Sequence, residues 1–249
     1  MKTPALKTPA LPTALPAALP TASDIVALHD RLLTTPGWPA LPATALPATA
    51  LPGTHPAWPW IETNHRYNSR LWAEEDLARR TTVAAAEIAA NKRAIDGFNQ
   101  ARNDATERVD EVLLVALGLV DEASARTDAP VSRVPAGARL NSETAGSMAD
   151  RLSILALKAH AMRAQAVRHD VDDAHRSASA AKLERLLQQR SDLSGCLDAL
   201  LTDAAAGRAY FKVYRQFKMY NDARFNPALV AENAAQLAAN TGHGGSGSA

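Results

Sequence analysis

The chain reads RLNSETAGSMADRLSIL over residues 139–155, and this stretch decides the fold. Apolar residues then occupy nearly every position from Leu152 to Leu157. A helix that is apolar on all sides is covered by its neighbours, so we expect the central helix of a bundle here. Ser147 is the expected N-cap, with Asp150 three residues on as in a capping box, and the helix should end near His169.

Four further helices are expected around the central one, with Thr82 capping the second of them and Gly207 ending the third. They cover residues 62–80, 84–118, 172–207 and 209–220. No stretch shows the period-two alternation of a strand. We therefore predict an all-α protein, an elongated helical bundle of about five main helices.

The N-terminal region differs sharply in composition, since 12 of the 15 prolines lie in the first 60 residues. Proline at this density cannot continue a helix, so residues 1–60 are expected to form a disordered Pro/Ala/Leu arm. One short amphipathic helix at 24–34 could dock on the body. The bundle domain should span 61–227, and residues 228–249 should be a flexible tail.

The composition limits which partners and which cellular location we expect. The formal net charge is +1, which provides no field to attract nucleic acid or an anionic membrane. Cys196 is the single cysteine and suits a reducing compartment. No run of about 18 apolar residues occurs, so we expect no membrane span and a cytoplasmic location. The sequence does not identify a cofactor.

Residues 100–114 and 188–202 resemble each other at an offset of 88 residues. Arg102 aligns with Arg190, and both fall in the apolar seam of their helices, where Leu or Ile would be ordinary. A seam arginine needs partners. Either each pairs internally, with carboxylates such as those of residues 74–76, or both converge on a central pocket that binds an anion.

Polar residues gather around the start of the central helix. Capping explains Ser147 and Asp150 but not the others together, and a helix N-terminus suits a phosphate or carboxylate. Arg151 and Lys158 are seven residues apart and share one helix face. The candidate ligand-binding residues here are Asn141, Ser142, Ser147, Asp150, Arg151 and Lys158, with Glu143 as a candidate catalytic group.

The first helix of the bundle carries two adjoining polar arcs, which would form either a solvated face or a wall facing a sugar or phosphate. The ligand-binding candidates in these arcs are Asn64, Asn68, Trp72 and Arg79. Glu75 is the preferred general base and His65 the second choice.

Two acidic clusters have the composition of metal sites. Asp104, Glu107, Asp110 and Glu111 resemble the acidic helix of a Mg²⁺-dependent all-α nucleotide pyrophosphohydrolase, but residues 74–76 lack the spacing expected of a second helix. The HDVDDAH run at 169–175 is explained by helix capping. No metal ligand is predicted.

The expected last helix alternates aromatic and basic residues in YFKVYRQFKMY. We interpret it as a docked amphipathic helix whose basic side lines the site rather than as a nucleic-acid surface. It adds Lys212, Arg215 and Lys218 to the ligand-binding candidates.

Four runs together resemble the bacterial domain-of-unknown-function family 4254 over residues 60–227. They are NHRYNSRLWAEEDLARR, IDGFNQARND, LNSETAGSMADRLSIL and FKVYRQFKMYND. GSMADRLSILALK is also similar to a stretch of a second uncharacterised family. Members of both accompany glycosyltransferases of envelope polysaccharide assembly, so the resemblance implies a glycosyltransferase-associated protein.

The leading hypothesis is a helical protein that binds, and could process, a phosphorylated or sugar-nucleotide-like anion. Arg102, Arg190, Arg151 and Lys158 would hold its charge. The rival is a non-catalytic helical adaptor or oligomeric scaffold, a homo-oligomer for instance, in which the seam arginines fix helix register. A Mg²⁺-dependent pyrophosphohydrolase is the third alternative.

Overall fold

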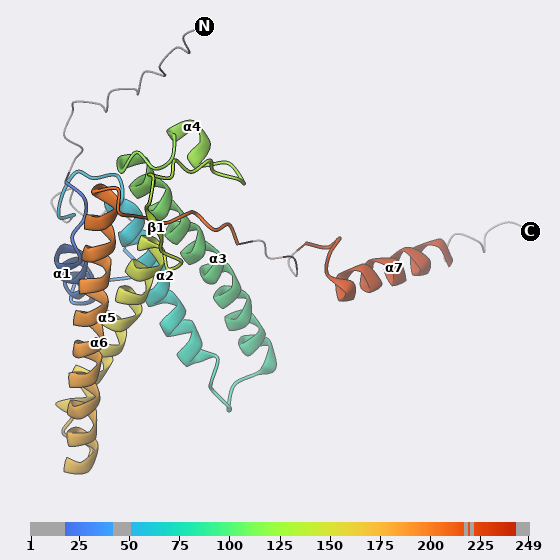
Figure 1. The fold of residues 1–249 in the computed structure, drawn as a ribbon. Helices are drawn as coiled ribbons and strands as arrows, with labels where there is room; N and C mark the ends of the chain where they lie inside the picture. The colour runs from blue at the N-terminus through green and yellow to red at the C-terminus, as the bar shows by residue number, and fades with distance from the viewer. Residues whose placement is uncertain (1–17, 42–50, 217–218, 220–221, 243–249) are drawn as a thin grey trace, which may run out of the picture. The chain divides into compact units, whose positions relative to one another are not determined.

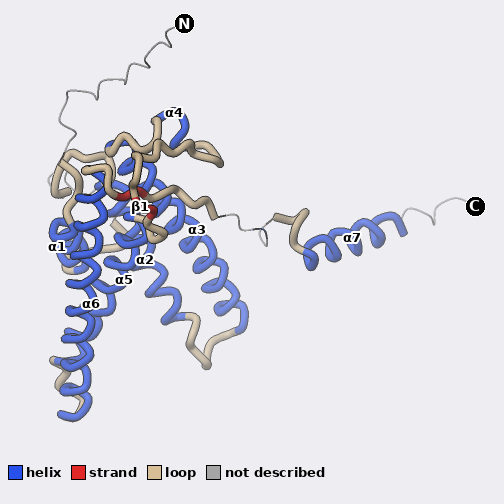
Figure 2. Tube along the Cα trace, viewed as in Figure 1, coloured by secondary structure: helices blue, strands red, loops and turns tan. Residues whose placement is uncertain are grey.

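The computed structural model describes residues 18–41, 51–216, 219 and 222–242. Contacts divide the chain into two compact units, Met1–Val213 and Tyr214–Ala249, each described by itself. Helices dominate the described residues, which confirms the all-α prediction (Figures 1 and 2). The elements are α1 (Ala22–Leu33), α2 (Trp58–Leu77), α3 (Ala85–Ala116), α4 (Glu122–Ala125), β1 (Arg139–Leu140), α5 (Ala145–Ala166), α6 (Asp173–Ala205), β2 (Ala209–Tyr210) and α7 (Pro227–Gly242).

Helix α5 is the central element, as predicted from its continuous apolar run. It packs against α1, α2, α3 and α6, and Leu152 and Ala156 are fully buried. Its N-cap is Thr144 rather than Ser147, because the Thr144 hydroxyl accepts a hydrogen bond of 3.1 Å from the Ser147 amide. The wrong cap residue leaves the prediction of the helix itself intact.

The helices α2–α3 and α5–α6 form two hairpins that repeat each other. Helix α3 begins at Ala85 and α6 at Asp173, an offset of 88 residues, which is the offset of the sequence repeat. Figure 1 shows the two hairpins meeting near β1 while their connecting turns lie apart. The repeat is therefore one of structure as well as sequence.

Helix α1 docks on this body, as its amphipathic pattern suggested. Ile25, Leu28 and Leu32 are buried, and the helix contacts α2, α5 and α6. Trp38, just beyond it, stacks on a core histidine. Residues 18–41 thus belong to the packed body. Residues 51–60 of the expected disordered arm are also described, and there Ala57 and Trp58 are buried and α2 begins at Trp58. The remainder of that arm, at 1–17 and 42–50, lies outside the described residues.

The predicted helix at 209–220 is wrong over its described part. Gly207 ends α6 with φ +71°, as expected, and the chain then forms β2, which pairs in parallel with β1. Ala209, Phe211 and Val213 are buried while the residues between them are not, which is the alternation of an extended chain. Its burial against the body outweighs the helical pattern.

Two smaller expectations also need correction. The N-cap position of α3 is Ala84, not Thr82, and no side chain caps it. Helix α7 occupies much of the tail that was expected to be flexible.

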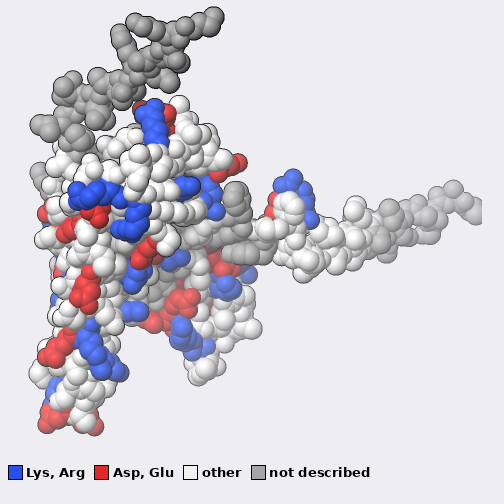
Figure 3. All heavy atoms as spheres, viewed as in Figure 1, with Lys and Arg blue, Asp and Glu red and all other residues white. Residues whose placement is uncertain are grey.

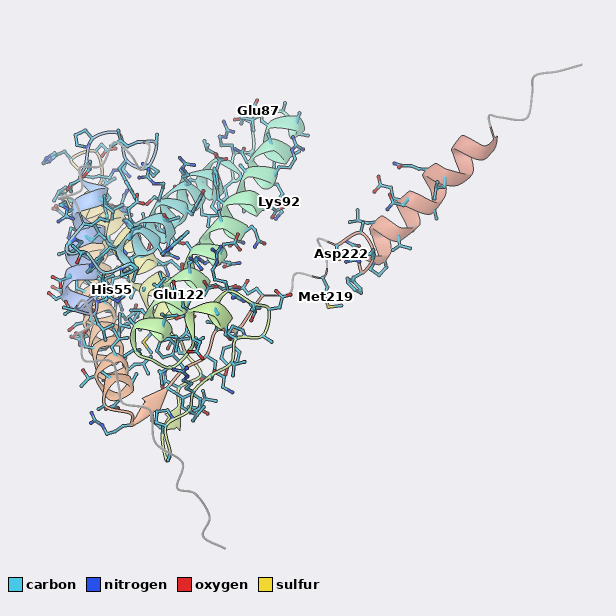
Figure 4. All side chains as sticks on the ribbon, turned by 90° about the horizontal axis from the view of Figure 1, so that it is seen from above. His55, Glu87, Lys92, Glu122, Met219 and Asp222 are labelled. Carbon is cyan, nitrogen blue, oxygen red and sulfur yellow. The ribbon has the colours of Figure 1, made fainter. Side chains whose placement is uncertain are left out.

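Charges of both signs are mixed over the face shown in Figure 3. Glu87 and Lys92 lie toward the start of α3, far from α4, which carries Glu122 (Figure 4). None of the described helices combines the length and apolar character needed to cross a membrane.

Candidate functional site

Asp150 is the hub of a buried polar network between α2, α3 and α5. Its Oδ1 accepts hydrogen bonds from Asn64 Nδ2 at 2.8 Å and Asn68 Nδ2 at 2.9 Å, and its Oδ2 accepts from Arg102 Nη1 at 3.3 Å. Asn68 also donates to Ser153 Oγ at 3.0 Å. The part of the predicted polar wall of α2 that holds Asn64 and Asn68 is thus directed into the interface between helices, where it fixes α2 against α5.

His65 is fully buried in the same interface. Its Nδ1 lies 2.7 Å from Ser153 Oγ, and its ring stacks on His29 at 4.3 Å and on Trp38 at 5.5 Å. Burial lowers the pKa of His65 to about 3, so the ring is neutral at physiological pH. This position removes His65 from the catalytic candidates, because an outside ligand cannot reach it.

His29 is the neighbouring buried base, and neither ring nitrogen has a partner among the described residues. Burial, aided by His65 and Arg190, lowers its pKa well below the ordinary 6.5. The unfolded chain therefore binds more protons below pH 6.5, and stability is lost as the pH falls. In the opposite direction, burial raises the pKa of Asp110 to about 7, which favours the folded state as the pH falls.

The difference between wild type and His29→Leu isolates the His29 contribution. In urea unfolding from pH 7.5 to 5, we expect the variant to gain on wild type by up to about 1.4 kcal/mol per pH unit below pH 6.5. A difference that stays constant with pH would show that His29 takes up its proton in the folded state as readily as in the unfolded one.

The two seam arginines pair internally, but not with residues 74–76. Arg102 pairs with Asp150 of α5, and Arg190 pairs with Asp30 of α1 through bonds of 2.7 and 3.0 Å. The two arginines therefore do not converge on one anion pocket, and that prediction is wrong. Both arginines instead pair with carboxylates inside the protein, as the first alternative expected, but with different partners.

Two aspartates that align in the repeat, Asp110 and Asp198, each accept a hydrogen bond from a backbone amide at the start of another helix. Asp110 Oδ1 accepts from the Gly146 amide at 2.6 Å, and Asp198 Oδ1 accepts from the Ala22 amide at 2.8 Å. Each repeat thus uses one aspartate to hold the start of a packed helix, α5 or α1. Both sites satisfy amides that a helix N-terminus leaves free.

The residues before α5 line a separate pocket of about 430 Å³, together with Arg139, Cys196 and Asp203 of neighbouring elements. The predicted residues in it are Asn141, Ser142 and Glu143. Arg151 forms an exposed ion pair with Glu143, whereas Lys158 lines a different pocket. The cluster expected around the start of α5 is therefore split between two places.

Lys158 belongs to a pocket of about 370 Å³ between α2, α5 and α6, which we call the cationic pocket. It is lined by Trp72, Lys158, Met162, Lys182, Arg185, Leu186 and Gln189. Its three cations, on two helices, have no ion-pair partner among the described residues. Trp72 is 37% exposed, which is unusual for its size.

A second pocket of about 300 Å³, which we call the acidic pocket, shares Trp72 with the first. It is lined by Asn68, Leu71, Trp72, Glu75, Asp76, Arg79, Ile154 and Leu157. Glu75 pairs with Arg79 at 2.9 Å, while no partner for the Asp76 carboxylate is found within the described ranges. Trp72, Arg79 and Glu75 thus lie at a surface that a ligand can reach.

The first hairpin fills the positions that correspond to Leu186 and Lys158 in a different way. At the 88-residue offset, Leu186 corresponds to Phe98 and Lys158 to Arg70. The Arg70 guanidinium lies 5.6 Å from the Phe98 ring centroid and 5.8 Å from that of Tyr67. In the first hairpin, an arginine stacked on two aromatic rings therefore occupies the positions that form an open pocket in the second.

Lys182, Arg185 and Gln189 were missed in the sequence. Their spacing of three and four residues places them on one face of α6, and this pattern could have indicated them. Of the basic residues predicted beyond residue 211, Lys212 lies over the Tyr210 ring, Arg215 belongs to the second unit, and Lys218 is outside the described residues.

No metal site forms in the described part of the chain, where no three His, Cys, Asp or Glu side chains come close enough to share an ion. The acidic residues of α3 point to separate partners: Asp104 accepts from Gln100 and Glu111 pairs with Arg108.

Comparison with known proteins places the chain in one family. The family model described as "Protein of unknown function (DUF4254)" matches residues 58–213, from α2 through β2. The match covers every residue that lines the two pockets sharing Trp72 and leaves α1 outside. No curated protein and no solved structure matches the chain. The chain belongs to the DUF4254 family.

Proposed function

We propose that this protein binds a small phosphorylated ligand in the cationic pocket. The proposal is carried by three cations around one pocket beside an exposed indole, Lys158, Lys182 and Arg185, which have no ion-pair partner among the described residues. Like charges gathered in one place repel each other, and an anion between them removes that repulsion and forms charge-assisted hydrogen bonds.

Different side chains of the pocket would contact different parts of the ligand. Lys158, Lys182 and Arg185 would hold the phosphoryl oxygens, and Trp72 would pack against the rest of the ligand. The Asp150 network fixes α2 against α5 and thereby sets the distance between Trp72 and Lys158. If the ligand is processed, Glu75 is the carboxylate best placed to act as a base, since Glu143 lies in another pocket.

Removing either of two pocket cations tests the proposal. In calorimetric titrations with inorganic pyrophosphate, we expect Lys158→Gln and Arg185→Gln each to weaken binding about tenfold, the loss of one charge-assisted contact. Arg163→Gln, which removes the same charge from α5 away from the pocket, should bind as wild type does. Equal affinities for all four proteins, or no binding by any, would contradict the proposal.

A non-catalytic adaptor or homo-oligomeric scaffold is the second candidate function. The internal ion pairs of Arg102 and Arg190 favour it, because they serve register rather than a ligand. A glycosyltransferase of envelope-glycan assembly is the partner we propose, and a cytoplasmic location suits the single Cys196. Light scattering on the purified protein separates a stable oligomer from a monomer, and only the oligomer supports the homo-oligomeric scaffold.

A further inference from the structure

We infer that the ligand is a sugar phosphate whose ring lies on Trp72 and whose hydroxyl groups face Asp76 and Glu75. This inference rests on the proposed function, since it extends the cationic pocket into the acidic pocket beside it. Trp72 lines both, so one indole separates a basic end from an acidic end.

The two pockets meet at Trp72, and both are lined by residues of one stretch of α5. Ile154 and Leu157 line the acidic pocket, and Lys158 and Met162 follow on the same helix in the cationic one. A ring placed against Trp72 would therefore lie beside both pockets. The apolar floor on both sides of Trp72 suits the C–H face of a ring rather than a chain of charges.

The acidic end excludes a second anionic group and selects for hydrogen-bond donors. An ionised carboxylate only accepts hydrogen bonds, and it can accept from two hydroxyl groups at once. Asp76 has no partner among the described residues, and the Glu75 carboxylate is held at 2.9 Å by Arg79. A polyhydroxylated ring supplies the donors that these carboxylates require, while its phosphate meets the three cations.

The Asp76→Asn variant tests the contacts made to the sugar ring separately from those made to the phosphate. We expect this variant to bind α-D-glucose 1-phosphate about fivefold more weakly than wild type, because two charge-assisted bonds become neutral ones. The same variant should bind inorganic pyrophosphate as tightly as wild type or up to about twofold more tightly, because a repelling charge is gone. Glu184→Gln, an exposed change of equal charge outside the pocket lining, should leave both affinities unchanged.

The outcomes distinguish this inference from the proposed function. If pyrophosphate binds and depends on Lys158, but α-D-glucose 1-phosphate binds no better than inorganic phosphate, the sugar inference is overturned and the anion site stands. Tighter binding of AMP than of the sugar phosphate, or an Asp76→Asn variant with unchanged sugar-phosphate affinity, also overturns it. Failure of all these probes to bind overturns both.

Discussion

Asp150→Ala is expected to lower the free energy of unfolding by about 3 kcal/mol. The change leaves the Arg102 guanidinium without its carboxylate and removes the acceptor shared by Asn64 and Asn68. Asn64 and Asn68 keep their bonds to Thr106 and Ser153, so the cost falls mainly on the Arg102 guanidinium at the contact between α2, α3 and α5. Urea unfolding at pH 7.5 measures the effect.

An exposed aspartate of α3 provides the control. Asp104→Ala removes an exposed carboxylate of α3 that accepts only a local bond from Gln100, and it should change stability by less than about 0.5 kcal/mol. Arg102→Met combined with Asp150→Ala should lose less than the sum of the two single losses, because the second change no longer breaks a pair. Additive losses would show that the two side chains do not interact.

Gly146→Ala is expected to destabilise by about 3 kcal/mol, or roughly 8 °C in Tm for a domain of this size. A Cβ at Gly146 would lie 2.4 Å from the Thr106 carbonyl oxygen and 2.9 Å from the Asp110 carboxylate. Backbone cannot yield as a flexible side chain does, so α5 would have to move away from α3. The backbone amide of residue 146 would then lose its 2.6 Å hydrogen bond to Asp110.

Two other helical glycines provide controls of opposite sign. A Cβ at Gly97 of α3 or Gly195 of α6 would meet no atom within 4 Å. Alanine at either position should raise stability by roughly 0.5 to 1 kcal/mol, since glycine is the poorer helix former. If Gly146→Ala behaved as these two do, the close approach of α5 to α3 would be wrong.

The sequence contained most of the helical architecture, because long amphipathic or apolar segments have few alternatives. The continuous apolar run at Leu152 to Leu157 identified the central helix, and Gly207 marked the end of α6. The segment after Gly207 was mistaken for a helix because its aromatic and basic residues match both periods over a few positions. Burial at Ala209, Phe211 and Val213 decides in favour of the extended form.

The ion-pair partners of the seam arginines could not be predicted from the sequence in the same way. Arg190 meets Asp30 across 160 residues, and Arg102 meets Asp150 across 48. Such pairs depend on how helices pack, which local patterns do not encode. The arginines were rightly judged to need partners, but a carboxylate near in sequence was a poor guide to the one near in space.

The residues of the candidate site were also predicted only in part from the sequence. Trp72 and Lys158 were indicated individually by their positions on two helices, and the structure brings both to one pocket. Lys182 and Arg185 were overlooked because surface cations on a long helix are common. What distinguishes them is the absence of carboxylate partners in the described structure, together with the small Leu186 in place of Phe98, and both features require coordinates.

The binding claim is tested most directly by the indole N–H signals in a ¹H–¹⁵N NMR spectrum. The chain has four tryptophans, and Trp72 is the most exposed of them, so Trp72→Phe identifies its signal by removing it. On titration with inorganic pyrophosphate, the account predicts a saturable shift of the Trp72 signal that is much weakened in Lys158→Gln, while the signals of Trp38, Trp58 and Trp60 stay in place. A Trp72 signal that does not move at millimolar pyrophosphate, or four signals that drift together without saturating, would contradict the site.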